Sequence, residues 1–129
     1  MTEGELTSEC LKLLRAELIG YVILKLSDRF TSGVPDVSID GCLRHMWLEF
    51  KTGDRVKWEN ELQRLTCMRL ERAGSCWIVM YEEVRMIRRT CIIRPSFVME
   101  SGKFTPHAFK VGFDHTFVLD FVKRMPHQP

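Results

Sequence analysis

Long apolar runs are absent from this chain of 129 residues, and their absence argues against a membrane-spanning helix, which needs roughly 18 consecutive apolar residues. The amino end, residues 1–5, is acidic and lacks the basic-then-apolar order of a secretory signal. Internal repeats, low-complexity stretches and linkers are missing too. We therefore expect a cytoplasmic protein without a membrane partner, built as one domain over residues 1–129.

Metal-binding cysteine patterns and a strong net charge are also absent. The five cysteines form no C-x-x-C pair and no zinc-like Cys/His spacing, so we expect reduced, buried thiols. The net charge is only +2. Acidic residues are nevertheless in excess over residues 1–50 and basic residues over 51–129. This asymmetry suits a cation site beside a polyanion-binding surface, and it suits ordinary solvated faces equally well.

Hydrophobic periodicity and turn residues predict a mixed α/β domain of order αβββαβ, followed by a less regular tail. The Asp40-Gly41 dipeptide predicts a tight hairpin turn. Three apolar side chains, Trp58, Leu62 and Leu65, are expected on the buried side of the second long helix. The expected elements are a helix near 2–18, strands near 21–26, 34–39 and 45–51, a helix near 57–73, a strand near 76–81, a short helix or turn near 82–88, a strand near 90–94, and a last helix capped by Asp114.

The segment from Gly33 to Lys51 carries the most chemical information. Side chains alternate across a strand, so Glu49 and Lys51 share one face and Phe50 takes the other. A hairpin then brings Asp36 beside Glu49 and Lys51, and we expect the three on one exposed patch. Each alone also suits a turn or a surface ion pair.

Two carboxylates that converge on a patch repel each other, and a divalent cation relieves that repulsion. Carboxylate oxygens are hard ligands that suit Mg²⁺ or Mn²⁺. A neighbouring lysine can orient or deprotonate water, or stabilise charge that grows on a phosphate. Metal-assisted hydrolysis of a phosphodiester fits these residue types.

The run Gly33-Val34-Pro35-Asp36, followed by Glu49-Phe50-Lys51, resembles the PD-(D/E)xK nuclease superfamily. The longer runs over residues 32–36 and 47–53 resemble its VRR-NUC branch. Gln63, Gly74 and the strand near 76–81 follow in the order of that branch, so the resemblance covers roughly residues 5–81. It implies a restriction-endonuclease-like core and leaves residues 82–129 as an extension without a recognised counterpart.

The resemblance also implies roles for individual residues. Asp36 and Glu49 would bind Mg²⁺ (or Mn²⁺), with the backbone carbonyl of Phe50 as a further ligand. Lys51 would act on the attacking water. Gln63 would orient that lysine or contact a phosphate. The branch has an acidic residue in its first helix, and we expect Glu9 there, with Glu5 as the alternative.

Basic and polar residues around the patch are candidate DNA contacts. They could equally be solvated surface residues. A second basic group occupies the region 85–94, and it too suits either a phosphate-binding strip or a solvated face. The residues chosen as DNA contacts are Lys25, Arg29, Ser32, Arg55, Arg88 and Arg89.

Together these observations predict a metal-dependent DNA endonuclease, with DNA as partner. Short members of the branch are phage or bacterial proteins of replication, recombination or repair, and some resemble Holliday-junction resolvases and act as homodimers. The resemblance therefore implies branched DNA, such as a junction or flap, and a homodimer as expectations. Two alternatives stay open: a non-catalytic DNA-binding or assembly module, and a ribonuclease.

Overall fold

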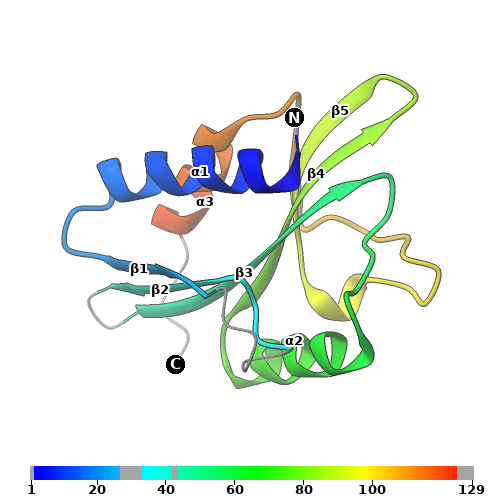
Figure 1. Ribbon diagram of the computed structural model, residues 1–129, viewed down its shortest axis with the longest axis horizontal. Helices are drawn as coiled ribbons and strands as arrows, with labels where there is room; N and C mark the ends of the chain where they lie inside the picture. Colours follow the sequence, from blue (N-terminus) through cyan, green and yellow to red (C-terminus); the bar gives the residue numbers. More distant parts are fainter. Residues whose placement is uncertain (1, 27–32, 42–43, 125–129) are drawn as a thin grey trace.

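One mixed β-sheet organises the chain, and the computed structural model describes residues 2–26, 33–41 and 44–124. The spatial order of the six strands follows the chain (Figure 1). All neighbouring strands run antiparallel except β3 and β4, which are parallel. The strands are β1 (Val22–Lys25), β2 (Val37–Gly41), β3 (Arg44–Gly53), β4 (Cys76–Val84), β5 (Ile87–Ile93) and β6 (Ala108–Val111).

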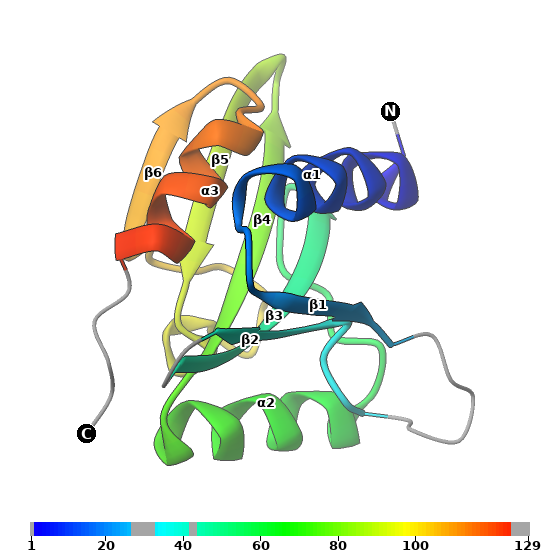
Figure 2. The same ribbon diagram turned by 90° about the vertical axis from the view of Figure 1, so that its left-hand side faces the viewer.

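Helices cover both faces of this sheet, as Figure 2 shows. Helices α1 (Glu3–Glu17) and α3 (His115–Arg124) lie on one face, and α2 (Glu61–Ala73) lies on the other. A short 3-10 helix, η1, spans Pro95–Phe97. Within the described ranges, no helix is both long enough and apolar enough to cross a membrane. The expected mixed α/β class is confirmed, and α1-β1-β2-β3-α2-β4 reproduces the expected αβββαβ order.

The helices occupy these positions for local reasons. Parallel strands need a crossover connection, and α2 supplies it between β3 and β4. Asn60 begins α2 by accepting the backbone N–H of Gln63 at 2.8 Å. Thr2 caps α1 in the same way, because its hydroxyl accepts the backbone N–H of Glu5 at 3.1 Å. The larger apolar core lies between the sheet and α1 and α3. A smaller one, on β4 and β5, is covered by Trp58, Val98 and Phe104.

The carboxyl-terminal third extends the same sheet. The expected helix or turn near 82–88 is a two-residue turn at residues 85 and 86 rather than a helix, because β4 and β5 pair as a hairpin down to Val84 and Ile87. Strand β6 adds the far edge, and α3 buries Val118 and Val122 against the larger core. Asp114 caps α3 as expected, since its carboxylate accepts the backbone N–H of Phe117 at 3.2 Å.

Two local predictions about the middle of the chain are wrong. Asp40 and Gly41 are not the turn residues, because they pair with His45 and Arg44 inside the β2–β3 ladder. The second helix begins at Glu61 rather than near residue 57, so Trp58 lies outside it. Its buried residues are Gln63 and Cys67, whereas Leu62 and Leu65 are 51% and 38% exposed. The polar Gln63 thus takes an inward position on α2, because its side chain has buried hydrogen-bond partners.

Candidate active site

The register between β2 and β3 brings Asp36 and Glu49 together. Val37 pairs with Leu48, so the residue that precedes β2 lies opposite Glu49. The backbone N–H of Asp36 donates to Glu49 Oε1 at 3.1 Å. In return, the backbone N–H of Phe50 donates to Asp36 Oδ2 at 3.2 Å. These bonds hold the two carboxylates next to each other, where β2 begins beside the second half of β3.

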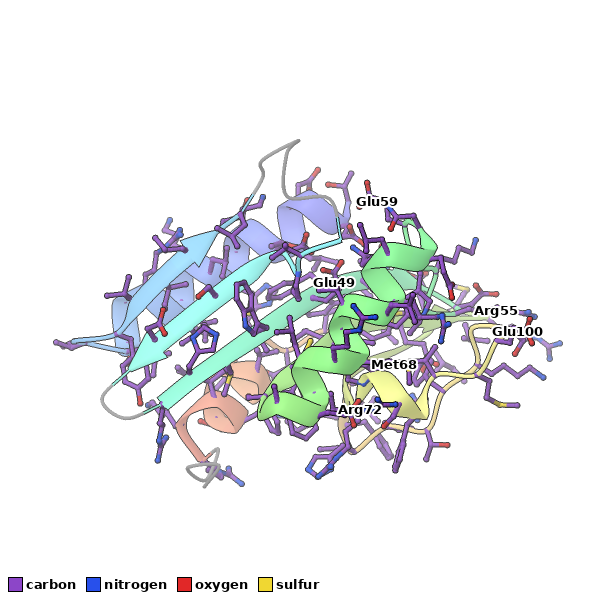
Figure 3. All side chains as sticks on the ribbon, turned by 90° about the horizontal axis from the view of Figure 1, so that it is seen from below. Glu49, Arg55, Glu59, Met68, Arg72 and Glu100 are labelled. Carbon is purple, nitrogen blue, oxygen red and sulfur yellow. The ribbon has the colours of Figure 1, made fainter. Side chains whose placement is uncertain are left out.

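Gln63 connects the glutamate and the lysine of this site. Its Oε1 accepts from Lys51 Nζ at 3.0 Å and from the backbone N–H of Glu59 at 2.9 Å. Its Nε2 donates to Glu49 Oε2 at 3.2 Å. Lys51 Nζ itself lies 3.4 Å from Glu49 Oε2. Figure 3 shows Glu49 beside the amino-terminal end of α2, the helix that carries Gln63.

This network is buried, which corrects the prediction of an exposed patch. Glu49 is 2% exposed, Gln63 is 3% and Lys51 is 8%. The strand alternation is as expected, because Phe50 points into the opposite, larger core. Buried charged groups are costly unless they are paired and hydrogen-bonded, and here each has such partners. Asp36 is half-buried and therefore lies at the more accessible edge of the group.

The pKa of Glu49 is raised from 4.5 to about 8, chiefly because burial disfavours the charged form. The nearby Asp36 carboxylate also raises this pKa, whereas Lys51 and the hydrogen bonds lower it. Desolvation is thus the main effect, and the lysine offsets it only in part. A buried carboxylate with a strongly perturbed pKa beside a second carboxylate is typical of a functional centre.

The first helix brings Glu3 near this site, whereas Glu9 contacts His115. Burial raises the pKa of Glu3, Lys51 lowers it and Asp36 raises it, and its carboxylate also bonds the backbone of Thr52. Glu3 therefore lies within electrostatic reach of both site residues. Sequence reasoning missed it, although an acidic residue in the first turn of this helix was the available signal.

Glu9 lies in a different group of polar side chains. Its Oε2 is 3.2 Å from His115 Nε2, and His115 Nδ1 is 2.8 Å from the hydroxyl of Tyr81. Tyr81 belongs to the larger core on the face that α1 and α3 cover. These contacts do not join Glu9 to Asp36, Glu49 or Lys51, and its place in the catalytic and metal-binding set stays a prediction.

The candidate DNA contacts are scattered. Lys25 is exposed on β1 opposite Val37, one residue from Asp36. Arg55 is exposed, and Figure 3 shows it apart from Glu49. Arg29 and Ser32 lie outside the described residues.

The basic strip on β5 is largely paired. Arg88 Nε lies 3.3 Å from Glu83 Oε2, and Arg89 Nε lies 2.5 Å from Glu82 Oε1. Arg89 also stacks over the ring of Phe109, 4.8 Å from its centroid. These two guanidinium groups are thus less available to phosphates than their sequence spacing indicates.

A hard divalent cation is compatible with the oxygen donors of Asp36 and Glu49. Within the described residues, no group of three or more His, Cys, Asp or Glu side chains is placed to hold a metal ion. A cation here would need backbone, water or phosphate oxygens as well. Mg²⁺ accepts such a mixed shell, because it usually keeps several waters and uses one or two carboxylates.

No family model and no curated protein matches this chain. Among solved structures, the chain is similar to Hjc of Archaeoglobus fulgidus, a Holliday junction resolvase from an archaeal hyperthermophile. The sequence identity is 9%, the TM-score is 0.49, and the match covers 79% of this chain and 84% of that chain.

Proposed function

We propose that this protein is a metal-dependent nuclease of the PD-(D/E)xK type, in one domain, that hydrolyses phosphodiester bonds of DNA. The observation that carries the proposal is the buried Glu49–Gln63–Lys51 network beside Asp36. Such a network is expensive to maintain as a purely structural feature, because apolar residues of similar volume pack as well or better. Its retention is explained if the site works on a charged substrate.

In this proposal, Asp36, Glu49 and the backbone carbonyl of Phe50 would hold Mg²⁺ or Mn²⁺. The cation would supply Lewis-acid stabilisation of the phosphate and a more acidic bound water. Lys51 presents its ammonium group to the attacking water and to the charge that develops on the phosphate. Gln63 keeps Lys51 in place through its Oε1 and keeps Glu49 in place through its Nε2.

Glu3 adds a third carboxylate from the first turn of α1. In this proposal Glu3 would accept a hydrogen bond from a water bound near Asp36, rather than replace either strand carboxylate. The resemblance to the VRR-NUC branch adds the finer expectations: a phage or bacterial cytoplasmic enzyme that acts on junctions or flaps and works as a homodimer. A dimer would allow both strands to be cut, because each copy would contribute the site described above.

The test is a cleavage assay on end-labelled single-stranded, duplex, flap and four-way-junction DNA, with Mg²⁺, with Mn²⁺ and with EDTA. We expect metal-dependent cutting by the wild type and none by Lys51→Ala or by the longer Lys51→Met. Lys57→Ala is the matched control, since Lys57 is an exposed lysine outside the network. Unchanged cutting by folded Lys51→Met would overturn the assignment, and an RNA duplex of equal sequence tests the ribonuclease alternative.

One observation favours the second candidate, a non-catalytic DNA-binding module. Both oxygens of Glu49 already accept protein hydrogen bonds, so the glutamate is satisfied without a cation. If this candidate is correct, the protein binds the same DNA substrates in EDTA and cleaves none of them with Mg²⁺ or Mn²⁺.

A further inference from the structure

The apolar side chains at the tip of the β4–β5 hairpin are exposed and do not pack into either core. Met86 is 91% exposed, the highest value among the large hydrophobic side chains of the described residues. Val84 and Ile87, which pair at the end of the ladder, are also exposed, at 40% and 64%. Figures 1 and 2 both show this hairpin projecting past the neighbouring elements.

The turn itself is strained. Arg85 and Met86 have φ values of 49° and 69°, and they are the only non-glycine residues with positive φ in the described chain. Two-residue hairpin turns of this shape strongly favour Asn-Gly or Asp-Gly, because L side chains rarely adopt the left-handed region. Backbone strain that is retained at an exposed tip, where a better turn is readily available, points to a role for the two side chains.

The tip also carries the uncompensated positive charge of the hairpin. Arg88 pairs with Glu83 and Arg89 pairs with Glu82 across the two strands. No carboxylate of the described residues lies within ion-pair distance of Arg85. The tip therefore presents the positive charge of Arg85 beside the exposed apolar side chain of Met86.

The sheet register places this tip beyond the candidate active site. Lys51 pairs with Met80, and the parallel strands β3 and β4 run toward the same end. Strand β4 then continues past the end of β3, whose last residue Gly53 pairs with Glu82. Met86 follows Met80 by six positions along the hairpin, which corresponds to at most about 20 Å. One turn of B-DNA is about 34 Å long, so a single duplex can contact both the site and the tip.

We propose that Arg85 and Met86 form a wedge for branched DNA. Met86 inserts at the discontinuity of base stacking, and Arg85 holds an adjacent phosphate. Apolar side chains enter DNA in this way most cheaply where stacking is already interrupted. The inference rests on the proposed nuclease function and deepens it, because it assigns the preference for branched DNA to one element outside the catalytic network.

The test compares the wild type with Arg85→Asn/Met86→Gly, a pair of changes that keeps the hairpin and suits its turn better. Binding to a four-way junction and to a linear duplex of the same sequence is measured by fluorescence anisotropy in EDTA. A 2-aminopurine base at the branch reports unstacking. Arg72→Ala/Met99→Ala is the control, because it removes the same side-chain types from exposed positions elsewhere.

We expect the hairpin variant to lose about tenfold in affinity for the junction, with linear-duplex affinity unchanged within about twofold. The rise in 2-aminopurine fluorescence should occur with the wild type and the control and be lost in the hairpin variant. An unchanged junction preference in that variant overturns the wedge, as does a wild type without any such preference. Loss of self-association in the variant with DNA binding unchanged assigns the tip to a second copy and also overturns it.

The cleavage assay separates this outcome from failure of the proposed function. If the wild type cuts DNA with Mg²⁺ while the hairpin variant keeps the junction preference, only the wedge is wrong. If the wild type neither binds nor cuts any DNA, the nuclease proposal fails and the wedge fails with it.

Discussion

Glu49 should make the metal-free protein less stable as the pH rises. The pKa of this carboxyl is about 8 in the folded protein and 4.5 as the ordinary value. Between these values the folded state holds a proton that the unfolded state releases, so the free energy of unfolding falls with increasing pH. Each unit of difference corresponds to about 1.4 kcal/mol. From about pH 5.5 to about pH 7.5, the titration of Glu49 should lower the free energy of unfolding by about 2.5 kcal/mol, because the slope flattens near the folded pKa.

The assay is urea denaturation in EDTA at several pH values, for the wild type and for Glu49→Gln. The glutamine has nearly the same shape but does not titrate, so the difference between the two curves isolates Glu49. We expect the wild type to lose stability relative to the variant as the pH rises. Replacement of EDTA by Mg²⁺ should reduce that loss. Parallel pH profiles would refute the reasoning that an incompletely compensated buried carboxylate lies in this site.

Three further predictions follow from particular contacts. Gln63→Leu leaves the buried Glu49 and Lys51 without their hydrogen bonds to this side chain, so it should lower the free energy of unfolding by about 2–3 kcal/mol and slow cleavage. Arg85→Asn/Met86→Gly relieves the strained turn and should gain about 1–2 kcal/mol, measured as a higher midpoint of thermal unfolding; a lower midpoint contradicts the strain. Thr2→Ala removes the cap of α1 and should cost about 1 kcal/mol, whereas Ser at this position should not.

The order of elements was predictable because it depends on local patterns. Asp114 as a helix cap and Phe50 as the inward neighbour of two polar residues follow from short-range rules of capping and alternation. The turn after Asp40 was misplaced, because Asp-Gly favours a turn locally while the β2–β3 register overrides that preference.

The composition of the site was predictable only in part. Asp36, Glu49, Lys51 and Gln63 are close in sequence, and the structure brings them together. Their burial was not predictable, since it depends on how α2 packs over β3. The choice of Glu3 over Glu9 depends on how α1 lies across the sheet, which helical spacing alone does not determine.

The central claim is that Asp36 and Glu49 hold the divalent cation that cleavage requires. The most direct measurement is a Mn²⁺ titration that follows bound metal by calorimetry and junction cleavage in parallel, for the wild type and Asp36→Asn. We expect binding and cleavage of the wild type to saturate over the same metal concentrations, and Asp36→Asn to lose both while remaining folded. Equal Mn²⁺ binding by both proteins, or cleavage by the wild type in EDTA, would contradict the claim.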